Sequence, residues 1–358
     1  MAKLLFKRIR KDIIQCNACS WYCKLADKQF GRCGIRLNNK GKLSTLVYNE
    51  VDNIAKIIGP EIDPVEKKPL FHFLPATKIF SFGTFGCNFG CAFCQNSWHT
   101  MPTKEVCLET IPDTEKFYKI KNIIDEVSEL YSPTELIDMA FKLDCKSIGY
   151  TYNEPVIFSE LAYECAKLAK KKGLKNVYVS NGFESKESID LIADYLDAIN
   201  IDLKAFNERF YREIVKGKLD VVKKNIKRFY ELGIWTEITT LVIPGRNDST
   251  CELKDAAEFI YKISPDIPWH VTAFHPAYKM QNVSHTPESS LKKVYDIGKR
   301  VGLNYIYIGN IWGEDLHSTY CPKCKKKIIR RDWTYTEIEA LRNGKCVYCG
   351  AEIKGVWK

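Results

Sequence analysis

The sequence predicts an α/β fold, a barrel of βα units with a small cysteine-rich module at each end. Strand-like runs alternate with helical segments at roughly 30-residue intervals, which is typical of βαβ units and a parallel sheet. An open nucleotide-binding sheet is less well supported, because no Gly-x-Gly-x-x-Gly follows a strand and no phosphate-loop lysine motif occurs. The candidate polar motifs follow the strand ends, where barrel enzymes place their chemistry.

Three regions are expected along the chain. Residues 1–75 form a cysteine-rich metal-binding segment, 76–312 the barrel, and 313–358 a zinc-ribbon-like domain. The expected barrel strands are rich in β-branched and aromatic residues and are bounded by Gly, Pro or Asn. They are residues 78–83, 147–152, 176–180, 198–203, 236–243, 270–274 and 305–309.

Two helix starts are readable in the barrel region. Ser132-Pro-Thr-Glu135 and Ser249-Thr-Cys-Glu252 each have the pattern of a capping box. An insertion at about 103–130 separates the first strand from its helix by an unusual distance. Loops of this length are typical of lids or binding segments, and disorder is the alternative.

Composition favours a cytoplasmic enzyme without a membrane segment. The 358 residues are 45% hydrophobic and 27% charged, no apolar run approaches the ~20 residues of a membrane span, and no export signal is visible. The net charge of +10 has two interpretations. One is a solvated face of scattered lysines, and the other is a phosphate-bearing partner such as nucleic acid.

The fifteen cysteines indicate metal binding. Disulfides are disfavoured in a cytosol, so clustered cysteines argue for metal sites. Eleven of them fall into three clusters with ligand-like spacing, and the other four are interpreted as packing residues. These four are Cys107, Cys145, Cys165 and Cys251.

The central cluster is Cys87-Asn-Phe-Gly-Cys91-Ala-Phe-Cys94, directly after the first predicted strand. A four-iron cluster has four corners, yet no fourth cysteine follows within a few residues. The motif therefore predicts a [4Fe–4S] cluster with one iron open to an external ligand. A structural zinc site would require four protein ligands.

Two further cysteine groups flank the barrel region. The first suits structural zinc or an auxiliary iron–sulfur cluster equally well by spacing, and the second has the spacing of a zinc ribbon. The first group is Cys16, Cys19, Cys23 and Cys33, and the second is Cys321, Cys324, Cys346 and Cys349.

Two other predicted strand ends carry candidate catalytic side chains. Asp202 and Lys204 are two positions apart on a strand, so they face the same side, and inside a barrel such a pair must be matched or functional. His275 follows the sixth strand and suits substrate or protonation chemistry, although a lone histidine is often structural.

The spacing Cys-x-x-x-Cys-x-aromatic-Cys, with Phe93 as the aromatic residue, resembles the signature of radical S-adenosylmethionine (SAM) enzymes. The resemblance implies that SAM chelates the open iron of Cys87, Cys91 and Cys94. It also implies that Asn153-Glu154 holds the SAM amino group, although Glu154 before Pro155 also suits a helix entry. The ribose or methionine carboxylate would then meet Ser180 and Asn181, for which plain turn chemistry is the alternative.

Nearly the whole chain resembles the radical SAM member of the AmmeMemoRadiSam system, a relative of pyruvate formate-lyase activating enzyme. The resemblance lies in residues 16–34, 63–75, 86–96, 152–155, 244–248 and 269–276. It implies a partial (β/α)6 radical SAM barrel and a low-potential electron donor such as ferredoxin or flavodoxin. It also implies association with AMMECR1-like and Memo-like proteins. The insertion departs from the family pattern. The roles that the resemblance implies for residues near the predicted cluster therefore have less support.

Three functions follow as hypotheses. The first is reductive cleavage of SAM to a 5′-deoxyadenosyl radical that abstracts hydrogen from an unidentified substrate. Activation of a glycyl-radical enzyme is a narrower form of it, and the basic tail favours a macromolecular substrate. The alternative of a different class is a non-catalytic metal-dependent scaffold that binds nucleic acid or protein, which leaves the three-cysteine loop unexplained.

Overall fold

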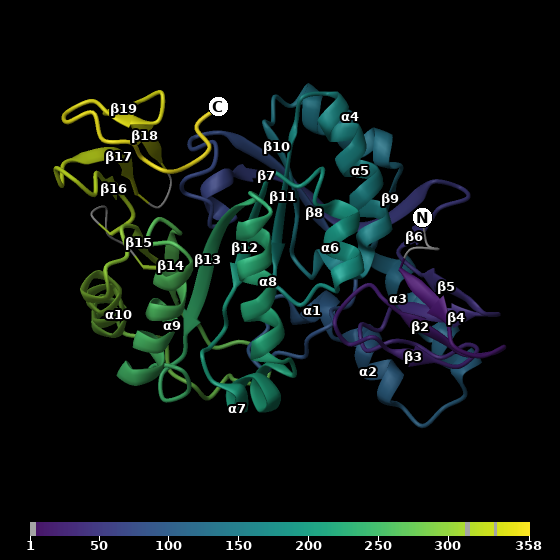
Figure 1. Cartoon of the computed structure of the whole chain (residues 1–358). Coiled ribbons are helices and arrows are strands. Elements are labelled where there is room, and N and C mark those ends of the chain that lie inside the picture. The colour runs from purple at the N-terminus through teal and green to yellow at the C-terminus, as the bar shows by residue number, and fades with distance from the viewer. Residues whose placement is uncertain (1–4, 312–315, 333–334) are drawn as a thin grey trace. The chain divides into compact units, whose positions relative to one another are not determined.

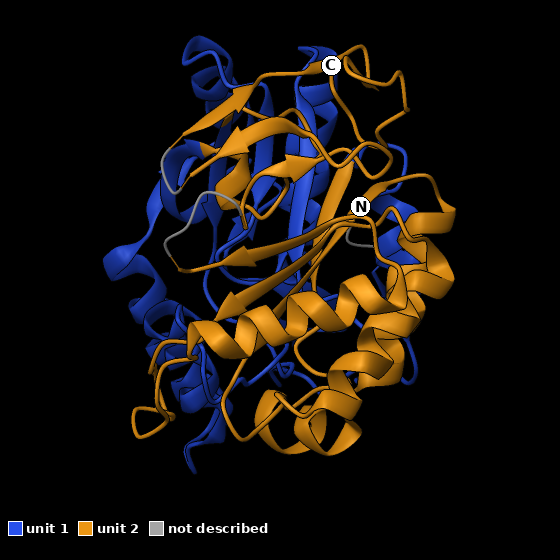
Figure 2. Cartoon of the chain, turned by 90° about the vertical axis from the view of Figure 1, so that its left-hand side faces the viewer, with its two compact units in different colours: residues 1–63, 79–197 blue, residues 64–78, 198–358 orange. Residues whose placement is uncertain are grey.

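The computed structural model describes residues 5–311, 316–332 and 335–358. The chain divides into two compact units, which Figure 2 colours separately. Unit 1 contains residues 1–63 and 79–197, and unit 2 contains residues 64–78 and 198–358. The predicted domain boundary at 312–313 lies outside the described residues.

A parallel sheet forms the core of unit 1 (Figure 1). Strand β10 pairs in parallel with β8 and with β11, and all four β10 residues are buried, as expected for a strand covered on both faces. Strands β7, β6 and β9 extend the sheet with antiparallel pairs. The bounds are β6 Tyr48–Asn49, β7 Ile54–Pro64, β8 Lys78–Gly83, β9 Glu129–Tyr131, β10 Ser147–Tyr150 and β11 Lys175–Ser180.

Short strands and six helices complete unit 1. Helix α5 packs against α4 and along β10 and β11. The helices are α1 Ser97–Thr100, α2 Pro102–Leu108, α3 Asp113–Val127, α4 Pro133–Lys142, α5 Ser159–Lys171 and α6 Lys186–Ile192. The N-terminal strands are β1 Phe6–Arg8, β2 Ile14–Cys16, β3 Lys24–Leu25, β4 Arg36–Asn39 and β5 Lys42–Thr45.

The insertion is folded, and the expectation of a long irregular loop or a disordered segment was wrong. Helices α2 and α3 pack against each other, and β9 pairs with β7. Buried Ile120 and Ile124, one turn apart on α3, explain why this charged segment folds against the unit.

Unit 2 contains four parallel strands in the order β12-β13-β14-β15. Small antiparallel strands follow near the C-terminus. The main elements are β12 Ala198–Asp202, β13 Trp235–Val242, β14 Trp269–Ala273, β15 Ile306–Gly309, α7 Glu208–Phe210, α8 Leu219–Glu231, α9 Thr250–Ile263 and α10 Glu288–Val301. The C-terminal strands are β16 Thr319–Tyr320, β17 Lys327–Arg331, β18 Thr336–Ile338, β19 Leu341–Arg342 and β20 Lys345–Cys346. The predicted α/β class with parallel strands is confirmed, and all seven expected strands are present.

One predicted capping box is complete and the other is partial. Ser132 Oγ accepts a hydrogen bond from the Glu135 N–H, and the Glu135 carboxylate accepts one from the Ser132 N–H. Ser249 caps α9 in the same way, but the Glu252 carboxylate accepts from the Phe206 N–H at 2.9 Å instead. The Glu252 carboxylate therefore bonds to a residue distant in sequence and does not complete the capping box with Ser249.

A buried carboxylate links the 64–78 segment to the sheet of unit 2. Glu237 on β13 is fully buried and accepts hydrogen bonds from the backbone N–H groups of Phe71 and His72, at 3.0 and 2.8 Å. It also accepts one from Trp235 Nε1 at 2.9 Å, and its other oxygen lies 2.6 Å from His270 Nε2. Burial alone would raise the pKa of Glu237, but the contact with His270 keeps it below its usual value.

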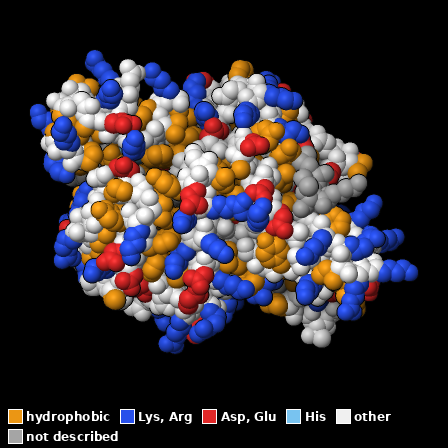
Figure 3. Space-filling model, viewed as in Figure 1, with side chains coloured by type: hydrophobic (Ala, Val, Ile, Leu, Met, Phe, Trp, Pro, Cys, Tyr) orange, Lys and Arg blue, Asp and Glu red, His pale blue; other side chains and the backbone are white. Residues whose placement is uncertain are grey.

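Two surface features bear on the sequence predictions. None of the described helices is both long and apolar enough to cross a membrane. Lysine and arginine side chains are dispersed over the face seen in Figure 3, with acidic side chains between them.

Candidate functional site

The three-cysteine loop follows β8 directly. Cys91 is buried, and Cys87 and Cys94 are half-buried. The Cys94 N–H donates to the Cys91 carbonyl at 3.2 Å, and Cys94 Sγ lies 3.2 Å from Thr100 Oγ1 on α1. The loop therefore folds back on itself and presents three thiols from one short segment.

Asn153 positions the start of this loop. Its Nδ2 donates to the Phe85 and Gly86 carbonyls at 3.2 and 3.1 Å, and to Thr84 Oγ1 at 2.9 Å. Gly86 has a φ of +78°, and a Cβ there would lie 2.3 Å from the Cys33 carbonyl, so only glycine fits. Asn153 was predicted to bind cofactor, but its amide is used by the loop backbone.

Lys104 supplies positive charge beside the loop. Burial raises the pKa of Cys87 well above its usual value, and the Lys104 ammonium is the largest opposing influence. Lys104 Nζ also donates a hydrogen bond to the Phe89 carbonyl. A thiolate at this position is favoured by nearby positive charge, which Lys104 supplies and a bound metal would increase.

Two buried carboxyl groups, Glu154 and Glu184, meet at one hydroxyl. Ser180 Oγ lies 2.9 Å from Glu154 Oε1 and 2.6 Å from Glu184 Oε1, but it has a single proton to donate. Glu154 also accepts from the backbone N–H groups of Asn181 and Val156, at 2.8 and 3.3 Å. Burial, and next the Glu184 charge, raises the pKa of Glu154, while burial raises the pKa of Glu184 to about 7. The pair therefore binds a proton, or another cation, near neutral pH.

Asn88 connects the cysteine loop to this acidic pair. Asn88 Oδ1 accepts from Asn181 Nδ2 at 2.7 Å, and the Asn88 carbonyl accepts from Trp21 Nε1 at 2.9 Å. Asn88 Nδ2 is buried and has no hydrogen-bond partner among the described residues. A buried donor without an acceptor costs about 1–3 kcal/mol, which a bound ligand with an acceptor atom would relieve.

The remaining predicted catalytic residues belong to unit 2. Asp202 and Lys204 pair with each other, with Nζ 2.8 Å from Oδ2, which provides the expected match. His275 is exposed, and its Nδ1 lies 2.7 Å from Nδ1 of His285. At that distance one of the two rings must donate a proton to the other.

The C-terminal quartet, Cys321, Cys324, Cys346 and Cys349, forms a compact thiol group. All four Sγ atoms lie within 4.8 Å of one another. Cys321 and Cys349 are 3.6 Å apart, and Cys324 and Cys346 are 3.7 Å apart. Four sulfurs bonded at ~2.3 Å to one tetrahedral ion would lie about 3.8 Å apart, so the donor set fits a single metal ion.

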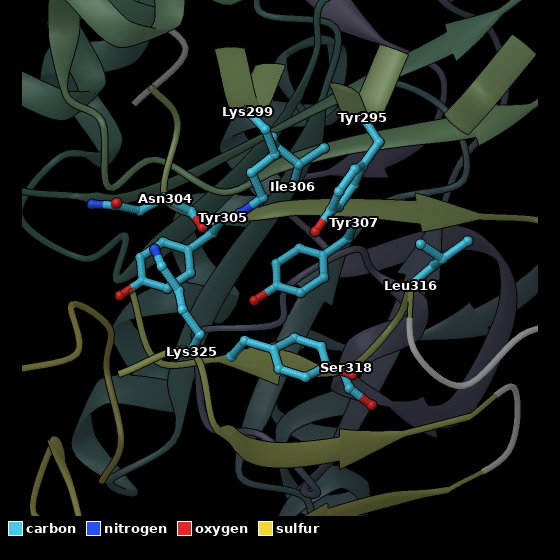
Figure 4. Close-up of a pocket in the computed structure, with 10 residues that line it drawn as sticks. Tyr295, Lys299, Asn304, Tyr305, Ile306, Tyr307, Leu316, Ser318 and Lys325 are labelled. Carbon is cyan, nitrogen blue, oxygen red and sulfur yellow. Dashed lines mark hydrogen bonds between the residues drawn. The ribbon is translucent and has the colours of Figure 1, made fainter. Parts of the chain in front are cut away.

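Unit 2 also contains a cavity of about 510 Å³ between α10, β15 and the start of the C-terminal strands. Figure 4 shows tyrosine rings and two lysine side chains around it. Burial lowers the pKa of Lys299. The lining includes Tyr295, Lys299, Tyr305, Tyr307, Tyr320 and Lys325.

Sequence reasoning missed three residues of the unit 1 site: Asn88, Lys104 and Glu184. Asn88 stands inside the cysteine motif and Glu184 only four positions after Ser180, but neither has a spacing signal of its own. Lys104 lies on α2, within the insertion whose fold was not predicted. Only the tertiary structure places these side chains around the loop.

A parallel α/β fold with a three-thiol loop after its first parallel strand, beside a buried acidic pair, defines an iron–sulfur enzyme with an open coordination position. The Radical SAM superfamily model matches residues 82–260. The chain belongs to the radical SAM superfamily.

Relatives extend this similarity. Uncharacterized protein MJ0808 of Methanocaldococcus jannaschii is 33% identical over 353 residues, 98% of each chain. MJ1632 of the same organism, which has the provisional name glycyl-radical enzyme activating enzyme, is 26% identical over 62% of this chain and 76% of its own length. Streptococcus suis SuiB bound to S-adenosylmethionine is 14% identical with a TM-score of 0.45, over 68% of this chain and 52% of SuiB.

Superfamily membership implies a [4Fe–4S] cluster and SAM, and the residues of unit 1 fit both groups. Three thiols leave one corner of a four-iron cluster without a protein ligand. Glu154 and Glu184 offer negative charge to an ammonium group, and Asn88 Nδ2 offers a donor to an acceptor atom.

Proposed function

We propose that this enzyme cleaves SAM reductively and uses the resulting 5′-deoxyadenosyl radical to abstract hydrogen from an unidentified substrate. The observation that carries the proposal is the three-thiol loop of Cys87, Cys91 and Cys94 next to the Glu154–Glu184 pair. When bound, the cluster supplies the single electron that breaks a carbon–sulfur bond of the SAM sulfonium.

The acidic pair binds and orients the amino group of SAM in this proposal. Without SAM, Glu154 and Glu184 share one proton, so one carboxyl group is neutral and the other ionised. When SAM binds, its ammonium group takes the place of that proton and donates charge-assisted hydrogen bonds to the carboxylates. The Ser180 hydroxyl and the Asn181 N–H hold the carboxylates in place. Because the pKa of Glu184 is raised to about 7, SAM binding tightens as the pH rises through that value.

The test is formation of 5′-deoxyadenosine by anaerobically reconstituted, reduced protein, measured by mass spectrometry. Cys94→Ala should abolish the product, because two thiolates hold the cluster poorly. Cys251→Ala is the matched control, since Cys251 is exposed and lies outside all cysteine motifs, and it should retain the product. Equal product from wild type and Cys94→Ala would overturn the proposal.

The narrower assignment is to the radical SAM component of the AmmeMemoRadiSam system, supported by the motifs at residues 16–34, 63–75 and 269–276. It predicts binding to AMMECR1-like and Memo-like proteins, which pull-down with each purified partner would test. Activation of a glycyl-radical enzyme is the second candidate, favoured by the similarity to MJ1632. A glycyl-radical signal in the electron paramagnetic resonance (EPR) spectrum of a co-incubated target would support it.

We further propose that the C-terminal quartet binds zinc in a ribbon-like domain of residues 313–358. The sulfur–sulfur distances of 3.6 and 3.7 Å support a single tetrahedral ion. Asp202, Lys204 and His275 stay proposed catalytic residues. Their alanine variants should still form 5′-deoxyadenosine but fail to turn over substrate once it is known.

A further inference from the structure

The N-terminal quartet, Cys16, Cys19, Cys23 and Cys33, lies in the hairpins of unit 1. Three of the four thiols are less than 9% exposed. Backbone hydrogen bonds hold the segment around them: the Cys16 N–H donates to the Cys23 carbonyl at 2.9 Å, and the Tyr22 N–H donates to the Cys19 carbonyl at 3.1 Å.

The thiol spacing of this quartet differs from that of the C-terminal quartet. In the part of the chain that the structure describes, the C-terminal quartet alone forms a group of three or more ligand atoms within 4.8 Å of one another. A single zinc ion needs that close spacing, because all four sulfurs bond to the same atom. A [4Fe–4S] cluster spreads its sulfurs farther apart, because each thiolate bonds to a different iron.

The N-terminal quartet also adjoins the three-cysteine loop. The Cys87 N–H donates to the Cys33 carbonyl at 3.2 Å, and Gly86 leaves no room for a side chain at this contact. On the same side of the loop, Trp21 Nε1 donates to the Asn88 carbonyl, and the Arg32 guanidinium lies 4.0 Å over the Trp21 ring. A backbone hydrogen bond thus joins Cys33 of the N-terminal quartet to Cys87 of the three-cysteine loop.

A buried ion pair fixes the strand that follows Cys33 in the chain. Arg36 is 2% exposed and pairs with Glu160 on α5, and its Nε donates to the Ile157 carbonyl at 2.7 Å.

We propose that the N-terminal quartet binds a second [4Fe–4S] cluster, which delivers electrons to the cluster of Cys87, Cys91 and Cys94. Four protein ligands leave no open iron for SAM or substrate, and the hydrogen bond between Cys33 and Cys87 favours electron transfer as the role of this cluster. The inference rests on the proposed radical SAM function.

The electron balance of this step is simple. A low-potential one-electron donor of the ferredoxin or flavodoxin class reduces the N-terminal cluster by one electron. With both clusters bound, that electron would pass on to the cluster of the three-cysteine loop, whose Cys87 is joined to Cys33 by a hydrogen bond. The N-terminal cluster returns to its oxidised state, and no bond or proton is exchanged.

Metal counting tests the site independently of SAM cleavage. Wild-type protein, reconstituted anaerobically, should contain about eight iron and about eight sulfide per chain, with about one zinc. A Cys87→Ala, Cys91→Ala, Cys94→Ala variant should keep about four iron and an EPR signal on reduction. Loss of all iron in that variant, with about two zinc per chain in the wild type, would overturn the inference while leaving the proposed function intact.

Cys19→Ser tests the role of the second cluster, with Cys107→Ala as a control outside both iron motifs. Cys19→Ser should keep about four iron and its zinc, which also shows that the variant is folded. Its 5′-deoxyadenosine rate should fall about tenfold or more with reduced flavodoxin and stay near wild type with dithionite. Equal rates with flavodoxin in Cys19→Ser and wild type would refute the electron-transfer role.

Discussion

Two buried acidic sites, Glu237 in unit 2 and the Glu154–Glu184 pair in unit 1, are held in opposite ways. Glu237 of unit 2 faces three N–H donors and His270, and its pKa stays below the usual value although burial opposes this. Glu154 and Glu184 of unit 1 instead face each other across one hydroxyl, and both pKa values are raised, first by burial. A carboxylate that faces hydrogen-bond donors and a histidine holds a fold together, whereas two carboxyl groups that share one hydroxyl favour a bound cation.

The largest effect should come from the satisfied carboxylate. Glu237→Ala leaves the donors of Phe71, His72 and Trp235 unpaired and should lower the free energy of unfolding by about 3–5 kcal/mol. Urea denaturation measures this change. Glu231→Ala removes an exposed pair with Lys227 and should change stability by less than about 0.5 kcal/mol. If the two variants lost similar amounts of folding free energy, Glu237 would contribute no more to stability than an exposed ion pair, which would contradict this comparison.

Removing one charge from the acidic pair should weaken SAM binding without destabilising the fold. Glu154→Gln replaces a charge-assisted contact to the SAM amino group with a neutral one, which should raise the Kd for SAM roughly 10- to 100-fold at pH 8. Calorimetric titration of the cluster-loaded protein measures the Kd. An unchanged Kd would show that the pair does not bind SAM.

Glu184→Gln should alter the pH dependence of stability. The raised pKa of Glu184 means that its contribution to stability is present at low pH and is lost as the pH rises through about 7. In SAM-free protein the advantage of the variant over wild type should therefore grow by roughly 1–3 kcal/mol between pH 5.5 and pH 8.5, and level off above about pH 7. Parallel denaturation curves at the two pH values check this. A constant difference would mean that Glu184 does not titrate in this range.

Local signals predicted much of this molecule. The seven parallel strands and the three cysteine groups follow from periodicity and spacing, which are properties of short segments. The insertion was not predicted, because α3 is held by a few buried residues on a charged helix. Only Glu154 of the acidic pair was predicted, because Glu184 lies in no recognisable motif. The Arg36–Glu160 pair joins residues 124 positions apart, and no local pattern reports such a contact.

The most direct test of the account is the low-temperature EPR spectrum of the reduced protein with and without SAM. If SAM binds at the open iron beside Glu154 and Glu184, it should change the g-values of the wild-type cluster signal at pH 8. Glu154→Gln should require more SAM for the same change, and Cys94→Ala should show none. A wild-type spectrum that is identical with and without saturating SAM would contradict the account.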